Sequence, residues 1–226
     1  MKRVAILQSN YIPWKGYFDI INSVDEFVLY DEMQYTKNDW RNRNIIKTQN
    51  GPQWISIPVK MSGLFGQKIN ETKVLNNLWR KKHWKTIKQN YSKATFFKEY
   101  EQQFEELYLR SNEDSLSEIN ISFIKLINEI LGIKTIITKS KEFNLIGEKS
   151  EKLVNICKTL KANIYISGPA AKNYLDIDLF NKENIEVKFI DYSKYKEYHQ
   201  LHGKFEHYVS VLDLIFNEGN QAVNYI

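Results

Sequence analysis

Short apolar runs alternate with amphipathic segments along this chain of 226 residues. A run of successive apolar residues bounded by polar turns predicts a strand whose two faces are both covered by helices. Apolar positions three or four residues apart predict a helix. The predicted strands lie near 3–8, 26–31, 54–59, 134–138, 163–167 and 186–191, and the predicted helices near 16–23, 74–95, 96–110, 116–131, 148–161 and 209–217.

Strands that alternate with helices predict an α/β fold on a mostly parallel, doubly wound, Rossmann-like sheet. Residues 74–131 interrupt the alternation, so we expect a helical excursion there, with Ser115 capping its last helix and Gly132 ending it. Neither a linker nor a repeat divides the sequence. We therefore expect one α/β domain over 1–226, with a helical tail at about 195–226.

Composition narrows the class of protein. Aromatic residues make up 14% of the chain, so many rings are expected to contact solvent or a ligand. The net charge of +5 comes from basic residues interspersed with acidic ones, without a nucleic-acid-binding signature, so no nucleic acid is expected as a partner. The single cysteine, Cys157, is predicted to be a buried core residue. A lone cysteine is typical of a protein from a reducing compartment. Because no signal peptide or spanning apolar run is present, we expect a cytoplasmic protein without membrane insertion.

The connection after the first strand carries more polar and aromatic side chains than a tight turn needs. Ligands of an open α/β sheet collect beyond the carboxyl ends of its strands, where the next helix points its free N–H groups. Lys15 would offer a positive charge there. The candidate binding residues of this turn are Asn10, Tyr11, Lys15 and Tyr17. In the alternative reading the rings plug the end of the sheet and Lys15 is solvated.

The second connection repeats this pattern. Asp31 ends the second predicted strand and is a candidate catalytic carboxylate. The residues after it combine guanidinium groups, which suit phosphate, with a tryptophan, which suits a base or sugar ring. The candidate binding residues are Gln34, Lys37, Trp40, Arg41 and Arg43. A charged hairpin is the alternative.

Two later stretches add candidates. The turn YISGPAAKNYL, residues 165–175, follows a strand with small residues and is either a ligand contact or a structural turn. In the tail, His199 or His202 could act as a general base, although structural histidines would fit as well. The three tail histidines lack a known zinc spacing, so no metal site is predicted. The binding candidates are Ser167, Gly168, Tyr174, Tyr198 and Gln200.

Three blocks of the sequence resemble the WbqC-like proteins of bacterial surface-polysaccharide gene clusters. They are QSNYIPWKGYFDIINSVDEFVLYDEMQYTKNDWRNRNIIKTQNGPQWISIPV, YISGPAAKNYLD and HGKFEHYVSVLDLIFNEG. The specific motifs are Q-x-x-Y-x-P-W-x-G-Y-F and D-x-x-Q-[YF]-x-K-x-x-W-x-N-R-N. Ser9 stands where proline is common and Lys15 where an apolar residue is frequent, which weakens a catalytic role for Lys15. The resemblance implies a role in O-antigen or related glycan synthesis.

A remoter likeness links the first turn to the nucleotidylyltransferase and pantothenate-synthetase superfamily, with its HUP-type fold. That superfamily carries H-x-G-H at its first helix, whereas residues 14–17 read WKGY. The likeness implies a nucleotide-binding scaffold, and the absence of both histidines argues against that superfamily's usual adenylyl transfer.

Three functions fit the residues and the resemblance. The first is a transferase that N-acylates or N-aminoacylates a nucleotide-linked amino sugar. Its donor would be a thioester on CoA or, since no CoA signature is present, on an acyl carrier protein that binds the lysine-rich segment 74–98. The second is an ATP-dependent adenylyltransferase or ligase-type enzyme, and the third is a non-catalytic module that binds a carrier or a sugar nucleotide. For all three we expect Trp40, Arg43 and His199 to share one hollow.

Overall fold

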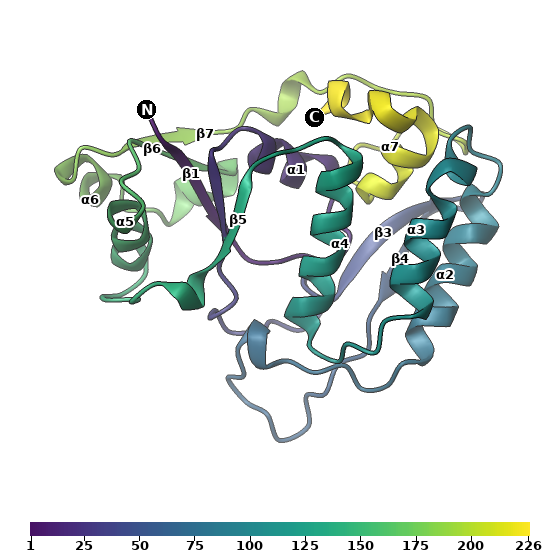
Figure 1. Cartoon of the computed structure of the whole chain (residues 1–226), viewed down its shortest axis with the longest axis horizontal. Coiled ribbons are helices and arrows are strands. Elements are labelled where there is room, and N and C mark those ends of the chain that lie inside the picture. The colour runs from purple at the N-terminus through teal and green to yellow at the C-terminus, as the bar shows by residue number, and fades with distance from the viewer. The chain divides into compact units, whose positions relative to one another are not determined.

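Most of the expected strands and helices are present in the computed structural model, which describes residues 1–226 (Figure 1). The chain forms two units. The first contains residues 1–8, 16–33 and 133–194, and the second contains residues 9–15, 34–132 and 195–226. The chain therefore passes from one unit to the other five times. The two units are defined by local packing, which does not test whether they fold as one domain or as two. The single domain therefore stays a prediction.

A parallel sheet of five strands forms the centre of the first unit (Figure 1). Its order is β5-β2-β1-β6-β7, and every neighbouring pair is parallel. This confirms the Rossmann-like α/β fold class and five of the six predicted strands. The strands are β1 (Arg3–Leu7), β2 (Glu26–Leu29), β5 (Ile136–Lys139), β6 (Ile164–Ser167) and β7 (Glu186–Phe189).

Helices of the first unit bury the apolar side chains of this sheet. The helices are α1 (Lys15–Asn22), α5 (Ser150–Thr159) and α6 (Ile177–Lys182). On one face, Tyr165 of β6 stacks on Phe180 of α6 with ring centroids 4.9 Å apart. Cys157 of α5 is buried in the same core, as expected, and burial raises the pKa of its thiol to about 12. The strands are apolar on successive residues because both of their faces are covered.

The second unit contains an antiparallel hairpin and four helices. The hairpin joins β3 (Arg43–Thr48) to β4 (Gly51–Ser56), with Ile45 opposite Trp54. The sequence prediction was therefore wrong to place a strand at 54–59 in the main sheet. A hairpin, which was the alternative structure for the second connection, is present over Arg43–Ser56. The adjacent Asn50 and Gly51 are the local signal for it, because this pair favours a tight turn between strands.

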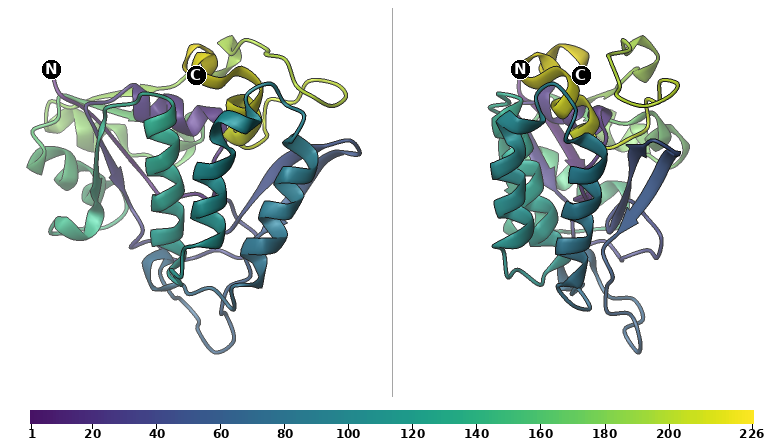
Figure 2. Two further views of the ribbon diagram at one scale, coloured as in Figure 1. Left: turned by 45° about the vertical axis from the view of Figure 1, so that its right-hand side comes forward. Right: turned by 90° about the vertical axis from the view of Figure 1, so that its right-hand side faces the viewer.

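The helical excursion is confirmed in the second unit. Its helices are α2 (Leu78–Tyr91), α3 (Phe97–Leu109) and α4 (Leu116–Ile130), and the tail contains α7 (Val211–Glu218) and the 3-10 helix η5 (Gly219–Tyr225). α2 and α3 pack side by side (Figure 2). α4 ends before Gly132, as expected, but Ser115 makes no side-chain capping bond to it. The Ser210 hydroxyl caps α7 by accepting from the Leu212 N–H. No helix in the structure is both long enough and apolar enough to cross a bilayer.

Aromatic side chains build the core of the second unit. Phe216 of α7 contacts Tyr91, Phe97 and Phe104, with ring centroids 5.5, 5.0 and 5.4 Å apart. Trp84 stacks between Phe97 and Tyr108. The high aromatic content is thus largely used in packing. The expectation that many rings contact solvent or a ligand holds for only part of them.

Replacing Phe216 by alanine should lower the free energy of unfolding by about 3–5 kcal/mol, because it leaves a cavity among three other rings. Urea denaturation followed by circular dichroism measures the change. Phe65→Ala is the matched control and should stay within about 0.5 kcal/mol, because the Phe65 residue is 99% exposed. Similar losses in both variants would contradict the packing of α7.

Candidate functional site

The strand order of the first unit reverses at the centre of its sheet. From β1 the chain continues to β2 and β5 on one side, and it later adds β6 and β7 on the other side. At such a reversal the two connections leave in opposite directions, so a crevice opens beyond the carboxyl ends of the central strands. The topology therefore predicts a ligand site beyond Leu7 of β1 and Ser167 of β6.

A cavity of about 740 Å³ lies at this reversal, and we call it the switch-point cavity. Its volume falls in the range of about 300–1,000 Å³ that is typical of small-molecule sites. Residues from the ends of the central strands, from the segment after β2 and from the start of α5 line it. They are Ile6, Leu7, Gln8, Tyr30, Met33, Glu148, Lys149, Ser150, Lys152, Leu153, Tyr165, Ser167 and Tyr174.

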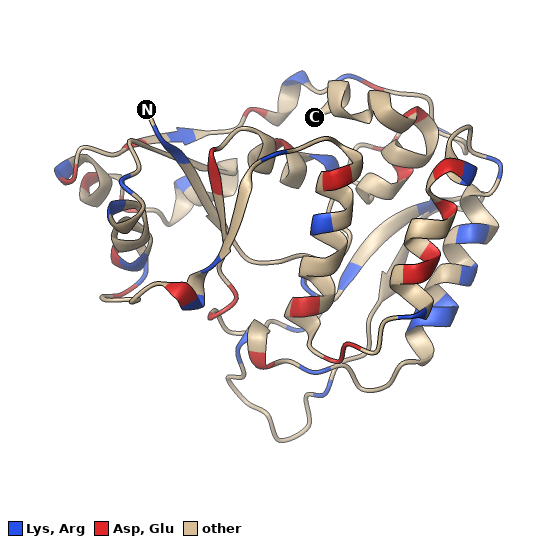
Figure 3. Ribbon diagram, in the orientation of Figure 1, with Lys and Arg blue, Asp and Glu red and all other residues tan.

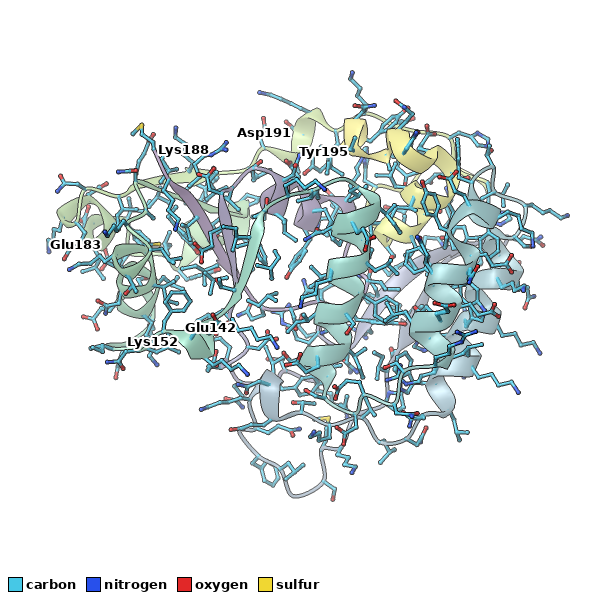
Figure 4. All side chains as sticks on the ribbon, in the orientation of Figure 1. Glu142, Lys152, Glu183, Lys188, Asp191 and Tyr195 are labelled. Atoms are coloured by element: carbon cyan, nitrogen blue, oxygen red, sulfur yellow. The ribbon has the colours of Figure 1, made fainter.

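The start of α5 brings two lysines to the edge of the switch-point cavity, next to Glu148 and Glu151. The first N–H groups of a helix have no carbonyl partner within it, and the helix dipole places partial positive charge there. Lys149 precedes α5. Lys152 lies in the first turn of the helix (Figure 4). Neither lysine has a carboxylate partner in the structure. This edge is therefore suited to an anionic group such as a phosphate.

Tyrosines and a single carboxylate complete the lining. Tyr174 is 70% exposed and offers a ring on which a base can stack. Burial raises the pKa of Tyr30 and Tyr165, so both hydroxyl groups stay protonated at neutral pH. Glu148 is the only carboxylate among the lining residues, and it can accept hydrogen bonds from sugar hydroxyl groups.

Of the five candidates predicted in the first unit, Ser167 and Tyr174 line the switch-point cavity and three do not. Asp31 is buried two residues after the end of β2. The Tyr17 hydroxyl donates to the Gln8 carbonyl over 2.9 Å, so Tyr17 holds the backbone of a lining residue instead of reaching a ligand. Packing explains Gly168, because a Cβ atom there would lie 3.2 Å from the hydroxyl of Tyr192.

The second unit has a smaller hollow of about 230 Å³, which we call the aromatic hollow. Its lining combines aromatic rings with two amides. The residues are Asn10, Pro13, Trp14, Trp40, Asn44 and Tyr208. The rings of Trp14 and Tyr208 lie 5.3 Å apart. Partly exposed rings beside amide groups are typical of sites for a flat, hydroxylated ligand such as a sugar.

Polar contacts beside the aromatic hollow connect several predicted residues. Arg41 Nη1 donates to Asn10 Oδ1 over 2.5 Å, and Arg41 Nη2 lies 3.5 Å from an Asp39 carboxylate oxygen. The Arg43 guanidinium lies 4.1 Å from the ring centre of Trp54, which in turn packs on Trp40. Gln34 and Lys37 are exposed and do not line the aromatic hollow.

Lys15 lies in a cage of aromatic rings within the second unit. Its Nζ lies 4.8 Å from the ring centre of Tyr195, 5.3 Å from that of Tyr198 and 6.0 Å from that of Phe205. The same amine donates to the Lys196 carbonyl over 3.0 Å. Burial lowers the pKa of Lys15 to about 8. The cage favours the cation through the ring faces, whereas the loss of water disfavours it.

Two predicted tyrosines of the second unit have internal partners. The Tyr11 hydroxyl bonds to His83 Nδ1 over 3.0 Å and to the Tyr108 hydroxyl over 2.6 Å, inside the aromatic core. The Tyr198 hydroxyl donates to Asp213 Oδ1 over 2.9 Å. Both rings are buried, and neither lines the aromatic hollow. The structure thus gives both residues packing and hydrogen-bonding roles in place of the predicted ligand contacts.

The tail is fixed by a buried polar network. Gln200 donates to the Tyr198 hydroxyl over 3.0 Å and accepts from Lys47 Nζ over 2.5 Å. Lys47 Nζ also donates to the Lys204 carbonyl. Burial lowers the pKa of Lys47 and raises that of Asp213. Gln200, another predicted binding residue, therefore holds the tail onto β3.

The tail histidines do not reach the aromatic hollow. His202 Nε2 bonds to the Asn90 carbonyl over 2.9 Å, and the exposed His199 uses its backbone N–H to donate to Glu218. We predicted that Trp40, Arg43 and His199 share one hollow. Only Trp40 lines the aromatic hollow, so the prediction is wrong for this hollow. No group of three or more His, Cys, Asp or Glu side chains is arranged to hold a metal ion.

Sequence reasoning missed most of the switch-point lining. Lys149 and Lys152 belong to a helix predicted at 148–161, and Gln8 and Tyr30 to strands predicted at 3–8 and 26–31, and none of the four was a candidate. The signal that could have found them is topological. The helix that leads into the first strand beyond a reversal begins at the same sheet edge as the crevice.

A five-stranded parallel sheet with a reversal at its centre and a cationic helix start beside it defines a Rossmann-like α/β protein with an open switch-point crevice. The chain belongs to the WbqC-like protein family, whose family model matches residues 8–225. This confirms the resemblance carried by the two N-terminal motifs. The chain is also 47% identical to the uncharacterized protein Rv1507c of Mycobacterium tuberculosis, over 100% of this chain and 98% of that protein. No solved structure matches the chain.

The Lys15 cage predicts a specific pH dependence of stability. Burial lowers the pKa of Lys15 from 10.5 to about 8, so the folded chain releases this proton at a lower pH than the unfolded chain does. The free energy of unfolding should therefore rise with pH between about 8 and 10.5, relative to a Lys15→Met variant. Urea denaturation of both proteins across this range measures the difference. Parallel pH profiles would contradict the cage.

Proposed function

We propose that this chain is a cytoplasmic transferase of bacterial surface-polysaccharide synthesis that binds a nucleotide-linked amino sugar in the switch-point cavity. The observation that carries the proposal is the cavity itself, at the one place where the sheet topology favours a ligand. Lys149 and Lys152 at its edge distinguish the switch-point cavity from an apolar void. Membership of the WbqC-like family supports the link to polysaccharide synthesis.

The lining suits each part of such a ligand. The diphosphate would bind at the start of α5 beside Lys149 and Lys152, where two lysines coincide with the positive end of the helix dipole. The base would stack on the exposed ring of Tyr174. Gln8 and Ser167 supply polar side chains at the carboxyl ends of β1 and β6 for the sugar hydroxyl groups.

The proposed reaction is acyl or aminoacyl transfer to the sugar amine. The nitrogen lone pair attacks the carbonyl carbon of a thioester, a C–N bond forms and the C–S bond breaks. The amine loses a proton to a base, and the thiolate that leaves takes up a proton. We assign the base to Glu148, the one lining carboxylate, in place of His199, His202 and Asp31. Donor groups beside the developing oxyanion would stabilise the tetrahedral intermediate.

The second unit supports a carrier-bound donor. We define the basic face as Lys81, Lys82 and Lys85 of α2, which are exposed and have no carboxylate partner. Figure 3 shows several basic positions along α2. Lys88 of the same helix differs, because it pairs with Glu101 over 2.6 Å. Unpaired positive charges along one helix favour an acidic partner. An acidic acyl carrier protein that presents a thioester fits this face.

Adenylyl transfer is a second candidate, because the strand order matches the doubly wound order of nucleotide-binding sheets. The residues at WKGY argue against it. Trp14 lines the aromatic hollow and Tyr17 is buried in the core of the first unit, so this turn offers no imidazole to a phosphate. Release of pyrophosphate from ATP in the presence of Mg²⁺ would favour this second candidate over acyl transfer.

The Lys149→Ala/Lys152→Ala variant should bind uridine or thymidine diphosphate amino sugars at least about tenfold more weakly than the wild type, because both charges that face the diphosphate are lost. Isothermal titration calorimetry measures the dissociation constants. Lys134→Ala/Lys141→Ala removes the same charge from exposed positions of the same unit outside the cavity, so its affinity should be unchanged. Equal weakening in both variants would show a general effect of charge and would contradict the assigned site.

The wild-type protein should convert a nucleotide-linked amino sugar and an acyl carrier thioester into an amide, detected by mass spectrometry. Glu148→Gln should lower kcat by about 10²–10⁴-fold while the dissociation constant of the sugar nucleotide is retained. Binding without turnover by the wild type, across a panel of acyl and aminoacyl donors, would favour the non-catalytic module instead.

A further inference from the structure

The segment between β4 and η1 (Ile69–Glu71) projects from the second unit as a loop, which we call the apolar loop and define as residues 60–68. It stands clear of the other elements of that unit in Figure 1 and in both views of Figure 2. Every residue from 60 to 66 is exposed. Because the side chains of residues 60–66 are not buried in their own unit, packing does not explain why some of them are apolar.

Apolar side chains occupy the tip of this loop. Phe65 is 99% exposed, Leu64 is 49% exposed and Met61 is 38% exposed. Single exposed apolar residues are common on protein surfaces, but a fully exposed phenylalanine with two apolar neighbours on one protruding tip is a patch that marks an interaction site. The tip therefore presents a contact surface that the unit itself does not use.

The loop is held at its base, so the tip is presented outward. The Lys60 N–H donates to the Lys73 carbonyl over 2.9 Å, and the Tyr35 N–H donates to the Gln67 carbonyl over 2.9 Å. Gln67 Nε2 donates to the Lys60 carbonyl over 2.9 Å and closes the neck of the loop. Beyond this neck, Gly63 and Gly66 have φ values of +75° and +74°, so the backbone turns sharply on both sides of Leu64 and Phe65.

Lysines flank the tip of the apolar loop. Lys60 and Lys68 stand at its two ends, and both are exposed without an ion pair. The loop itself, residues 60–68, contains no aspartate or glutamate. Acidic groups lie only beside its neck, where a Glu71 carboxylate oxygen accepts from the Lys68 N–H over 2.9 Å and Asp114 pairs with Lys73. The loop is thus an apolar tip with two lysines at its base, which is complementary to an apolar layer beneath an anionic one.

We propose that the apolar loop inserts Leu64 and Phe65 into the interfacial region of an anionic lipid bilayer, with Lys60 and Lys68 at the level of the headgroups. Such insertion reaches about 5–10 Å into a leaflet and needs no spanning segment. The sequence expectation of no membrane insertion rested on the absence of a long apolar run, which excludes a spanning helix but not a shallow wedge. Anionic lipids attract the two lysines.

A lipid surface fits the tip better than a protein partner does. Protein interfaces concentrate their binding energy in tryptophan, tyrosine and arginine that fill preformed pockets. The tip is instead a narrow protrusion, and the loop contains no tryptophan, tyrosine or arginine. Its two lysines complement a layer of anionic headgroups. A deformable apolar medium accepts such a shape without a complementary pocket.

Co-sedimentation of the full chain with phosphatidylcholine vesicles, with and without phosphatidylglycerol, tests this proposal. The wild type should bind the vesicles that contain phosphatidylglycerol, and the Leu64→Ser/Phe65→Ser variant should lose about tenfold or more of its partition coefficient. Lys60→Ala/Lys68→Ala should lose about fivefold per lysine, and added salt should weaken the wild type in the same way. Leu78→Ser is the matched control, because Leu78 is 79% exposed on α2 and should not affect binding.

The variants concern exposed side chains, so circular dichroism should show an unchanged thermal transition, and lost binding then reports on the tip alone. In a Phe65→Trp variant, brominated lipids should quench the added fluorescence. Failure of the wild type to sediment with either vesicle would overturn the proposal. Equal binding by the wild type and Leu64→Ser/Phe65→Ser would also overturn it, as would a self-association, seen by light scattering, that this variant abolishes without any lipid binding. None of these measurements needs a sugar nucleotide, so the result is independent of the proposed transferase activity.

Discussion

The reversal of strand order between β1 and β6 is the constraint on which the first unit depends. Parallel strands need crossovers, and crossovers of one hand can cover both faces of a sheet only if the chain leaves the central strand in two opposite directions. Where the two directions part, no connection covers the strand ends. The switch-point cavity is thus a consequence of how the sheet is wound, and the side chains around it determine only which ligand it suits.

The second unit depends on a different interaction, the buried polar network around Lys47 and Asp213. Buried charges are costly unless hydrogen bonds satisfy them. Lys47 Nζ donates to two acceptors in the tail, and Asp213 Oδ1 accepts from Tyr198, although Asp213 Oδ2 has no hydrogen-bond partner. These bonds restrict the arrangement of the tail. Gln200 is central because its amide oxygen accepts from Lys47 Nζ and its amide nitrogen donates to the Tyr198 hydroxyl. Polar residues gathered in the tail therefore serve to hold an irregular segment that has few aliphatic side chains to bury.

The strands of the main sheet could be predicted because each is apolar on successive residues, and the helices because their apolar spacing is regular. The hairpin was harder, since β3 carries Arg43, Asn44 and Lys47 and resembles a polar loop. For the site, Ser167 and Tyr174 were found because Ser167 ends β6 and Tyr174 lies in the connection that leaves it. Tyr11, Tyr17 and Tyr198 were misread for a physical reason: a hydroxyl on a ring needs a partner, but sequence does not tell whether that partner is a ligand or another residue.

The same position in a fold can carry different chemistry in different proteins. The turn at residues 9–17 is an example. An H-x-G-H turn brings imidazole groups to a phosphate. The side chains of this turn instead contact other parts of the protein. Tyr17 holds the Gln8 carbonyl, and Lys15 is enclosed by rings of its own unit. The positive charge of the switch-point cavity comes instead from Lys149 and Lys152 at α5. A nucleotide bound there would have its phosphates at the α5 side of the reversal, so the reacting end of the ligand would be oriented by β6 and α5 and not by the first turn.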